Sequence, residues 1–570
     1  MTIADRTVGC KIPARPSFYE DPKVEPSAGA PCRSLARTSV RISPRVLSYI
    51  LIRRCRFVRL GDERFHSSRS SPPSCWRFGG APKQPVLRSL GMPRRSALLL
   101  ATLVSLLCAQ PVFNAKDYGA TGIKSDNARP ALQQAIDACG KAGGGTVYVG
   151  PGEYTTGQLH LRSRVRLYLE AGATLFASLD GAQFDPSPKS ALISGEDLHD
   201  IALEGRGTLD GQSTYEWHRN SITDFYILSN QRLMEATGKP LMRPFPHGFP
   251  DEKIYPRMVL LLRCTDVRIT GLRFLRSRSW TINPYACRRL VIDGVYIYSS
   301  RKEAVWADGI DPDGCQDVRI ANSTVETGDD ALVFYSADIW GPALPVENVT
   351  VTNCRLSSAS SAIKFCDCNS NAIRRVNIDN VVITDSNRGI AFMVFDGGIV
   401  EDVVLSNLTI ETRRFDWFWW GDGDPLHFNI KRRSEVDGNT RANEPAAGRI
   451  RNVIIQNVIA HGTGASVING HPASWLEGVR LDNIKLFVSS SPGAPYEHTA
   501  TALTVRQARG LRMSNVEIAW EKPFAATWRN GLSLEQVKDA ILDRVEVHPP
   551  PGSKSQPIVS TDAEYVVWPK

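Results

Sequence analysis

The sequence lacks a hydrophobic run long enough to cross a membrane. Its main apolar run, from Ala97 to Leu107, is much shorter than the roughly 20 residues that a transmembrane helix needs. We therefore expect no membrane span. With 570 residues, 42% of them hydrophobic, the chain is nevertheless large enough to bury a sizeable core.

The sequence also lacks an excess of positive charge outside its first part. The formal net charge is +9, but residues 1–91 alone hold 14 Arg and 3 Lys against 6 Asp and Glu. The rest of the chain is therefore mildly acidic, and the overall charge is no argument for binding to nucleic acid. We expect no nucleic-acid partner.

Paired cysteines at metal-binding spacing are absent as well. Cys366 and Cys368 have no second pair at the spacing of a zinc finger, so we expect no structural metal and no cofactor. Four other cysteines take similar places in successive repeats, and we predict that these are small stacked core residues: Cys264, Cys287, Cys315 and Cys354.

The first 91 residues differ from the remainder in composition. They are rich in Arg, Ser and Pro and show no sustained period of 2 or 3.6. Met92 then begins a segment with two arginines, the apolar run and a small residue at Ala109, which are the three parts of a secretory signal. We interpret 1–91 as a non-native or disordered extension, 92–109 as a signal peptide, and 110–570 as one domain of a secreted or periplasmic protein. The alternative is a disordered basic extension before a single core helix.

A short repeat dominates the chain from Val267 onward. Apolar-x-apolar pairs flank a polar residue with Asn or Gly, as in DVRIANSTV, RVNIDNVVI and GVRLDNIKL. The copies recur at a nearly regular period, except for one much longer interval between Val403 and Val453, which we interpret as two turns with a loop insertion. Short β-runs at such a period, without helices between them, predict an all-β, right-handed parallel β-helix. A leucine-rich repeat needs a Leu frame and helices, and a β-sandwich does not keep so regular a motif.

One helix is expected at the start of this solenoid. The segment from Asn127 to Ala142 places Leu132 and Ile136 on one side, and three glycines follow it as a stop signal. Because an open first strand invites edge-to-edge association, we predict that this N-terminal helix caps the solenoid.

The most acidic stretch, residues 306–330, holds six aspartates. Turn chemistry accounts for three of them, Asp311, Asp313 and Asp317. It accounts poorly for Asp329 and Asp330, whose adjacent carboxylates precede an apolar run. Two carboxylates held close together raise one pKa, which a general acid requires.

Coil spacing predicts that a third carboxylate joins this pair. Asp308 precedes Asp329 and Asp330 by the length of one short coil, and neighbouring coils stack about 4.8 Å apart. The three acids should therefore cluster on one face. Two carboxylates roughly 6.5–9.5 Å apart, with room for a water molecule, are the requirement for hydrolysing a glycosidic bond with inversion.

Several motifs carry a resemblance to a known family: FNAKDYGA, GGGTVYVGPGEYTTG, LEGRGTLDGQ, WTINPYACRRLVIDG, ADGIDPDGC and TGDDALV. From roughly Phe113 to Val516 the chain resembles glycoside hydrolase family 28, the polygalacturonase-like enzymes of the pectin lyase-like superfamily. The resemblance implies Asp329 as general acid, with Asp308 and Asp330 holding the attacking water. We expect a monomer whose partner is a pectin-type or related plant or microbial polysaccharide or oligosaccharide.

Two motifs of that family are missing. Its Gly-His-Gly segment falls on 360–362, where Ser361 replaces the histidine. Its Arg-Ile-Lys segment, which grips the galacturonate carboxylate, falls on 391–393 and reads Ala-Phe-Met. Lys364 and Arg388 lie close by and are candidate substrate-binding replacements, although each is about as readily a solvated or turn charge. We therefore expect a substrate other than simple polygalacturonate.

The aromatic stretch 415–420 supplies two further candidate substrate-binding residues, Trp419 and Trp420, because aromatic rings can stack on sugar rings. Packing of a long loop against the solenoid is the alternative interpretation. We assign no role to His427 or His471.

Two other functions stay open. Loss of the family histidine fits a catalytically inactive carbohydrate-binding solenoid. A polysaccharide lyase of the same fold would need a Ca²⁺ cluster and a basic Arg or Lys to abstract a proton, which the Gly-Asp-Asp segment and the missing Arg-Ile-Lys disfavour.

Overall fold

The computed structural model describes residues 111–568, apart from 187, 214–255, 302–303, 305, 416–420, 438–440 and 492–498. The expected extension over 1–91 and signal peptide over 92–109 lie outside the described residues, and so do Trp419 and Trp420. Within the described part, no helix is long and apolar enough to span a bilayer.

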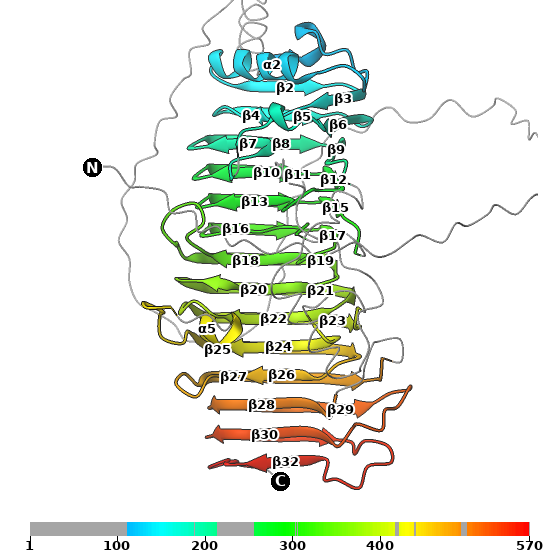
Figure 1. The fold of residues 1–570 in the computed structure, drawn as a ribbon, viewed down its shortest axis with the longest axis vertical. Coiled ribbons are helices and arrows are strands. Elements are labelled where there is room, and N and C mark those ends of the chain that lie inside the picture. Colours follow the sequence, from blue (N-terminus) through cyan, green and yellow to red (C-terminus); the bar gives the residue numbers. More distant parts are fainter. Residues whose placement is uncertain are drawn as a thin grey trace, which may run out of the picture. The chain divides into compact units, whose positions relative to one another are not determined.

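The chain is a right-handed parallel β-helix, as its repeat predicted (Figure 1). Every pairing between its named strands is parallel, and most strands pair with a strand one coil before and a strand one coil after. One face consists of β1 (Val112–Asn114), β2 (Gly145–Val149), β5 (Val165–Leu169), β8 (His199–Gly205), β11 (Thr265–Thr270), β14 (Arg288–Asp293), β16 (Gln316–Ala321), β19 (Val346–Ser358), β21 (Ala372–Ser386), β23 (Ile399–Thr412), β25 (Arg449–Gly462), β27 (Leu476–Val488), β29 (Arg512–Trp520) and β31 (Ile541–Val547).

A second face carries the acidic stretch. Its strands are β7 (Ala191–Glu196), β10 (Arg257–Leu262), β13 (Ile282–Tyr285), β18 (Leu332–Ser336), β20 (Ser361–Asn369), β22 (Arg388–Val394), β24 (Asp424–Ile430), β26 (Ser466–Asn469), β28 (Thr501–Arg509) and β30 (Asn530–Lys538). Between β13 and β18, Ile310 forms a single bridge to each of its neighbours. Short strands such as β12 (Arg273–Leu275), β15 (Tyr296–Tyr298) and β17 (Thr324–Thr327) complete the early coils.

The lead apolar residues of the repeat stack in register inside the solenoid. The pairings run without a break through Val267, Leu290, Val318, Val349, Val376, Val403, Val453 and Val479. All of them are buried. Beneath the second face, Phe334, Phe365, Phe392 and Phe428 stack with ring centroids 5.3, 4.2 and 4.1 Å apart. This core holds successive coils at fixed spacing.

The asparagines of the repeat turn the chain at the corners between strands. Asn322, Asn353 and Asn380 have φ angles of 53°, 55° and 54°, in the left-handed region that Asn tolerates better than most residues. Their amides also bond from coil to coil, from Asn353 Nδ2 to Asn322 Oδ1 at 3.2 Å and from Asn380 Nδ2 to Asn353 Oδ1 at 2.8 Å. The turn residue is therefore fixed by both backbone conformation and a side-chain ladder.

The long interval between Val403 and Val453 is a single coil, so the prediction of two turns was wrong. These two residues pair directly with each other. The extra length lies in two loops of that coil, one between β23 and β24 and one between β24 and β25, and the second contains the short helix α5 (Arg433–Asp437). Only strand pairing distinguishes an enlarged coil from two ordinary ones.

The expected helix is present as α2 (Arg129–Lys141), two residues shorter at its start and one at its end than predicted. It lies at the end of the solenoid next to β2 (Gly145–Val149) (Figure 1). Its buried side chains, Leu132 and Ile136 among them, join the main core.

The four cysteines are buried, as predicted, but only three of them stack in one row. Cys264, Cys287 and Cys315 directly precede residues that pair from coil to coil, so they stack in one row. Cys354 is also buried, but it pairs with Val381 in a different row. All four are free thiols.

Candidate active site

Two glycines let the acidic segments pass close to neighbouring coils. Asp329 and Asp330 lie between β17 and β18, directly after Gly328, and a Cβ atom on Gly328 would lie 2.2 Å from the Ala304 carbonyl oxygen. A Cβ atom on Gly309, after Asp308, would lie 2.3 Å from the Ala331 carbonyl oxygen. Any side chain at either position would push the coils apart, because both contacts are with backbone.

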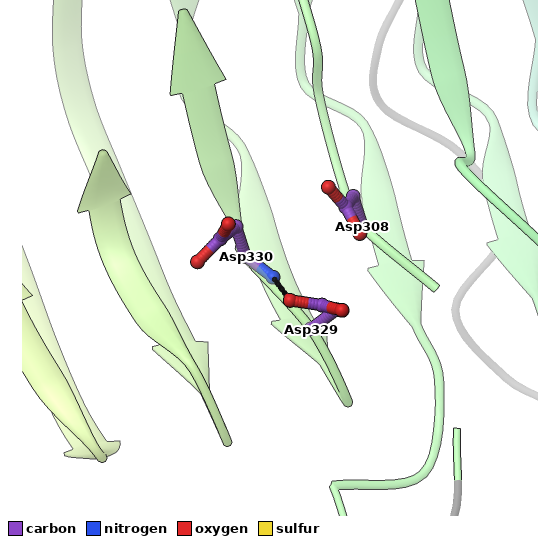
Figure 2. A group of neighbouring side chains, drawn as sticks. All are labelled: Asp308, Asp329 and Asp330. Carbon is purple, nitrogen blue, oxygen red and sulfur yellow. Dashed lines mark hydrogen bonds between the residues drawn. The ribbon is translucent and has the colours of Figure 1, made fainter. Parts of the chain in front are cut away.

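The structure brings the three predicted acids together (Figure 2). The Gly309 amide donates to the Asp330 carbonyl oxygen at 2.9 Å, which sets Asp308 beside Asp330 on adjacent coils. Asp308, Asp329 and Asp330 are 2%, 7% and 2% exposed, and one carboxylate oxygen from each lies within 4.8 Å of those of the other two. Spacing by one coil therefore predicted a real cluster.

One oxygen of each carboxylate lies within 4.8 Å of one from each of the other two, so all three acids can contact the same small group. The three oxygens are also close enough to hold a cation together. However, the Lys364 ammonium already supplies a positive charge at Asp330, 2.9 Å from its Oδ2.

Asp330 is held by three donors. Its Oδ2 accepts from Lys364 Nζ at 2.9 Å, and its Oδ1 accepts from Ser360 Oγ at 2.7 Å and from the Ser361 amide at 2.9 Å. All of these groups are buried, so the contacts are little screened by solvent. Such charge-assisted bonds are strong, so they fix the position of the carboxylate. Lys364, which was predicted to bind substrate, therefore forms an ion pair with Asp330, one of the three candidate catalytic acids.

Asp329 has the properties of a proton donor. Burial, followed by the charge of Asp330, raises the pKa of Asp329 to about 7. Backbone amides of Trp306 and Asp330 donate to its two oxygens at 3.2 and 2.9 Å, which fixes the side chain. A carboxyl group of this kind keeps its proton at mildly acidic pH, as a general acid must.

Asp308 comes from the coil before Asp329 and Asp330, and its carboxylate has fewer hydrogen-bond partners than theirs. The Tyr335 hydroxyl lies 3.4 Å from its Oδ2, and its Oδ1 has no partner among the described residues. Burial and the charge of Asp329 raise the pKa of Asp308 well above its usual value. The two carboxyl groups titrate together, so protonation of one favours ionisation of the other.

The turn interpretation of the other aspartates is right for one and wrong for two. Asp317 has a φ of 57° at a corner. Asp311 and Asp313 are fully buried, Asp313 in an isolated bridge. Neither oxygen of Asp311 has a partner among the described residues, and burial, then the charge of Asp330, raises the pKa of Asp311 well above its usual value.

Asp313, which has no role in the proposed reaction, allows the effect of burial on an aspartate pKa to be tested through protein stability. Burial raises its pKa to about 7, above its ordinary value of 3.8, so between these two pH values the folded state binds more protons than the unfolded state. The free energy of unfolding therefore falls as pH rises through this window, by up to about 1.4 kcal/mol per pH unit for each such group. We expect Asp313→Asn to flatten the fall in thermal midpoint between pH 5 and 7. A pH dependence equal to that of the unsubstituted protein would contradict this assignment.

The positions 361, 391 and 393, where the resemblance predicts a histidine, an arginine and a lysine, are buried in the structure. Ser361 is buried, and its hydroxyl has no partner among the described residues. Ala391 and Met393 are buried in an outer apolar cluster with Phe395, against which Val436 of α5 packs. The place of the carboxylate-gripping Arg and Lys is therefore covered by a packed hydrophobic cluster.

Arg388 lies one coil beyond Ser361 but faces another acid of the chain. It pairs with Ser361 across the sheet, and its Nε lies 3.5 Å from Asp424 Oδ2. His427 Nδ1 contacts the same carboxylate oxygen at 2.7 Å. Burial lowers the pKa of His427, so this histidine is neutral at ordinary pH. Arg388 thus has a counter-ion within the protein.

Sequence reasoning missed a group on the N-terminal side of the acids. Arg257 of β10 lies between the rings of Trp280 and Trp340, and Trp280 stacks on Tyr335 with ring centroids 5.2 Å apart. No local motif marks Arg257, which is far from the acids in the sequence. Only the stacking of coils could have revealed it.

The comparisons with known proteins agree with this geometry. Residues 247–390, which contain all three acids, match the family model for glycosyl hydrolases family 28. A probable polygalacturonase from Vitis vinifera is 25% identical over 433 residues, covering 70% of this chain and 80% of that protein. An exopolygalacturonase from Zea mays is 24% identical over 245 residues, covering 42% of this chain and 52% of that protein.

Solved structures share the fold. The family 28 exopolygalacturonase of Yersinia enterocolitica superimposes with a TM-score of 0.57 at 19% identity, covering 76% of this chain and 78% of that one. The predicted resemblance is confirmed over residues 247–390, and the chain is similar along most of its length to a probable polygalacturonase, which supports a glycoside hydrolase.

Proposed function

We propose that this protein cleaves O-glycosidic bonds of a pectin-type polysaccharide with inversion, using Asp329 as the acid. The observation that carries the proposal is the pairing of a buried, proton-retaining Asp329 with a neighbouring Asp330 that is held by Lys364 and two serines. A carboxyl group that keeps its proton, next to a second carboxylate that an ammonium and two serines hold in place, is an arrangement that suits acid-catalysed glycoside hydrolysis.

In the proposed reaction, Asp329 protonates the leaving glycosidic oxygen while the bond from that oxygen to the anomeric carbon breaks. A water molecule forms the new bond to the anomeric carbon from the opposite face. Its proton passes to the carboxylate pair of Asp308 and Asp330, and the product is a sugar with a free reducing end. The Ser360, Ser361 and Lys364 contacts keep Asp330 in place during this step.

The competing functions differ in their products. Incubation of the protein with a panel of pectins and hemicelluloses should release reducing ends without ultraviolet-absorbing unsaturated ends. Unsaturated ends would instead support a lyase. Binding to a glycan without any new chain ends would support the inactive carbohydrate-binding solenoid.

Polygalacturonate is expected to be a poor substrate. Ala391 and Met393 replace two cations, and each uronate carboxylate would lose a charge-assisted contact of about 1.5–3 kcal/mol, which is a loss of roughly tenfold or more for each contact. We expect kcat/KM for polygalacturonate to fall well below that for a neutral or rhamnose-containing glycan. Comparable turnover of the two would contradict this prediction.

We further propose that the enzyme is exported with the segment 92–109 as its signal and acts as a monomer outside the cytoplasm. Purification from the native host and sequencing of the mature N-terminus tests the first part. The prediction is a terminus near Gln110, and residues from before Met92 in the mature protein would contradict it.

A further inference from the structure

Arg257 presents a cation to the outer surface of the second face, on the N-terminal side of the acids. Its guanidinium lies between Trp280 and Trp340, with 4.9 and 4.7 Å to the two ring centroids. Its Nε donates to Asn283 Oδ1 at 3.0 Å, and its Nη1 donates to the Pro188 carbonyl oxygen at 3.0 Å. The two rings and these two neutral acceptors fix the plane of the guanidinium.

Within the described part of the chain, no carboxylate forms an ion pair with this cation. Of the residues that the structure describes, none brings a carboxylate within ion-pair distance of Arg257, and its Nη2 has no acceptor there. Burial lowers the pKa of Arg257 to about 10, so the group is still charged at neutral pH. A charge that is shielded from water and lacks a counter-ion is costly, and such groups are a mark of binding sites.

The acids nearest to Arg257 do not neutralise it. Asp308 and Asp311 are its main electrostatic partners, but burial raises the pKa of both well above the usual range. Asp311 Oδ1 and Oδ2, fully buried, and Asp308 Oδ1 have no partner among the described residues. Among the described residues, the region therefore offers one cation that no ionised carboxylate contacts.

We propose that Arg257 forms an anion-binding subsite for the carboxylate of a uronic acid residue. A carboxylate matches the planar donor arrangement of an arginine. This subsite would bind a uronate carboxylate on the N-terminal side of the acids, whereas the cations that are missing at Ala391 and Met393 would have bound one on the C-terminal side.

The position of the subsite specifies the order of sugars in the substrate. The Met258 amide bonds to the Trp280 carbonyl oxygen, and the Thr281 amide bonds to the Asp308 carbonyl oxygen, so Arg257 lies two coils before Asp308, about 10 Å along the solenoid. A chain in which uronic acid and neutral residues alternate can supply both a uronate at Arg257 and a neutral sugar at the acids. This order of sugars rests on the proposed function, because that function places the cleaved bond at the three acids.

The test compares two oligosaccharides on a variant that cannot cleave them. Asp329→Asn protein is titrated calorimetrically with an oligosaccharide of alternating rhamnose and galacturonic acid, and with the same compound after chemical reduction of its carboxylates to alcohols. We expect the acidic compound to bind at least about tenfold more tightly. Adding Arg257→Gln should abolish this preference, and Arg257→Lys should retain part of it.

The matched control is Arg289→Gln, which removes an exposed arginine paired with Asp266 on a different face. Equal affinity for the two compounds, preference retained in Arg257→Gln, or no binding of either compound would each overturn the proposal. If Arg257→Gln does not fold, an unchanged preference in Arg257→Lys overturns it instead. Failure of the wild-type protein to cleave any glycan contradicts the proposed function alone, because the binding preference is measured without cleavage.

Discussion

Replacing Asp329 by Asn is expected to lower kcat by about 10²- to 10⁴-fold while leaving the fold intact. The amide keeps the shape of the side chain but has no proton to give to the leaving oxygen, and general acid catalysis contributes about this factor. The measurement is the rate of reducing-end release at saturating substrate. Thermal stability should stay the same or rise, because the variant removes one of three carboxyl groups that repel one another.

A matched control is Asp317→Asn, since Asp317 is an aspartate of the same acidic stretch at a corner between strands, with a φ of 57° that Asn also tolerates. It should retain wild-type kcat. The wild-type rate should also decline as pH rises through about 7, where Asp329 loses its proton. Retention of most activity in Asp329→Asn would rule out its role as the acid.

Replacing Lys364 by Met is expected to destabilise the protein by about 3–5 kcal/mol and to remove activity, because removing one partner of a buried ion pair leaves the other charge uncompensated. The Lys364 and Asp330 side chains are 10% and 2% exposed, so water cannot take over the role of the ammonium. Asp330 would then lose the ammonium that holds its Oδ2, and with it the position that the proposed reaction requires. Denaturant unfolding and the reducing-end assay measure the two effects.

The double variant Lys364→Met with Asp330→Asn separates these effects. It removes both charges, so most of the lost stability should return, while activity should stay absent. A buried pair replaced by neutral side chains of similar size is often as stable as the original. Equal stability of Lys364→Met and wild type would mean that the ammonium does not compensate Asp330.

The repeat and the acid cluster were predictable because both depend on local spacing. Alternating apolar residues define the strands, Asn tolerates the left-handed turn, and one short coil returns the chain from Asp308 to the neighbouring pair, Asp329 and Asp330. Each of these features depends on a short segment of sequence. The stacked pairing of Val267 through Val479 follows directly from the same repeat.

The features that were not predictable depend on what neighbouring coils contribute. Asp311 has the sequence context of a turn, yet the Ile310 bridges bury it between β13 and β18. Cys354 follows the lead apolar residue of its repeat, Val349, whereas the other three cysteines precede theirs, and the strand pairing places it in another row. Lys364 and Arg388 are equally close to the family motifs, and only packing shows that one meets Asp330 and the other Asp424.

The most direct test of the central claim is the anomeric configuration of the first product, followed by proton NMR before mutarotation. With a pectin polysaccharide that contains rhamnose and galacturonic acid, the account predicts new reducing ends whose configuration is the inverse of the cleaved linkage, and no signal from Asp329→Asn protein. Retained configuration would contradict the single-displacement mechanism, and the absence of new reducing ends on every glycan in the panel would contradict hydrolysis by this acid cluster.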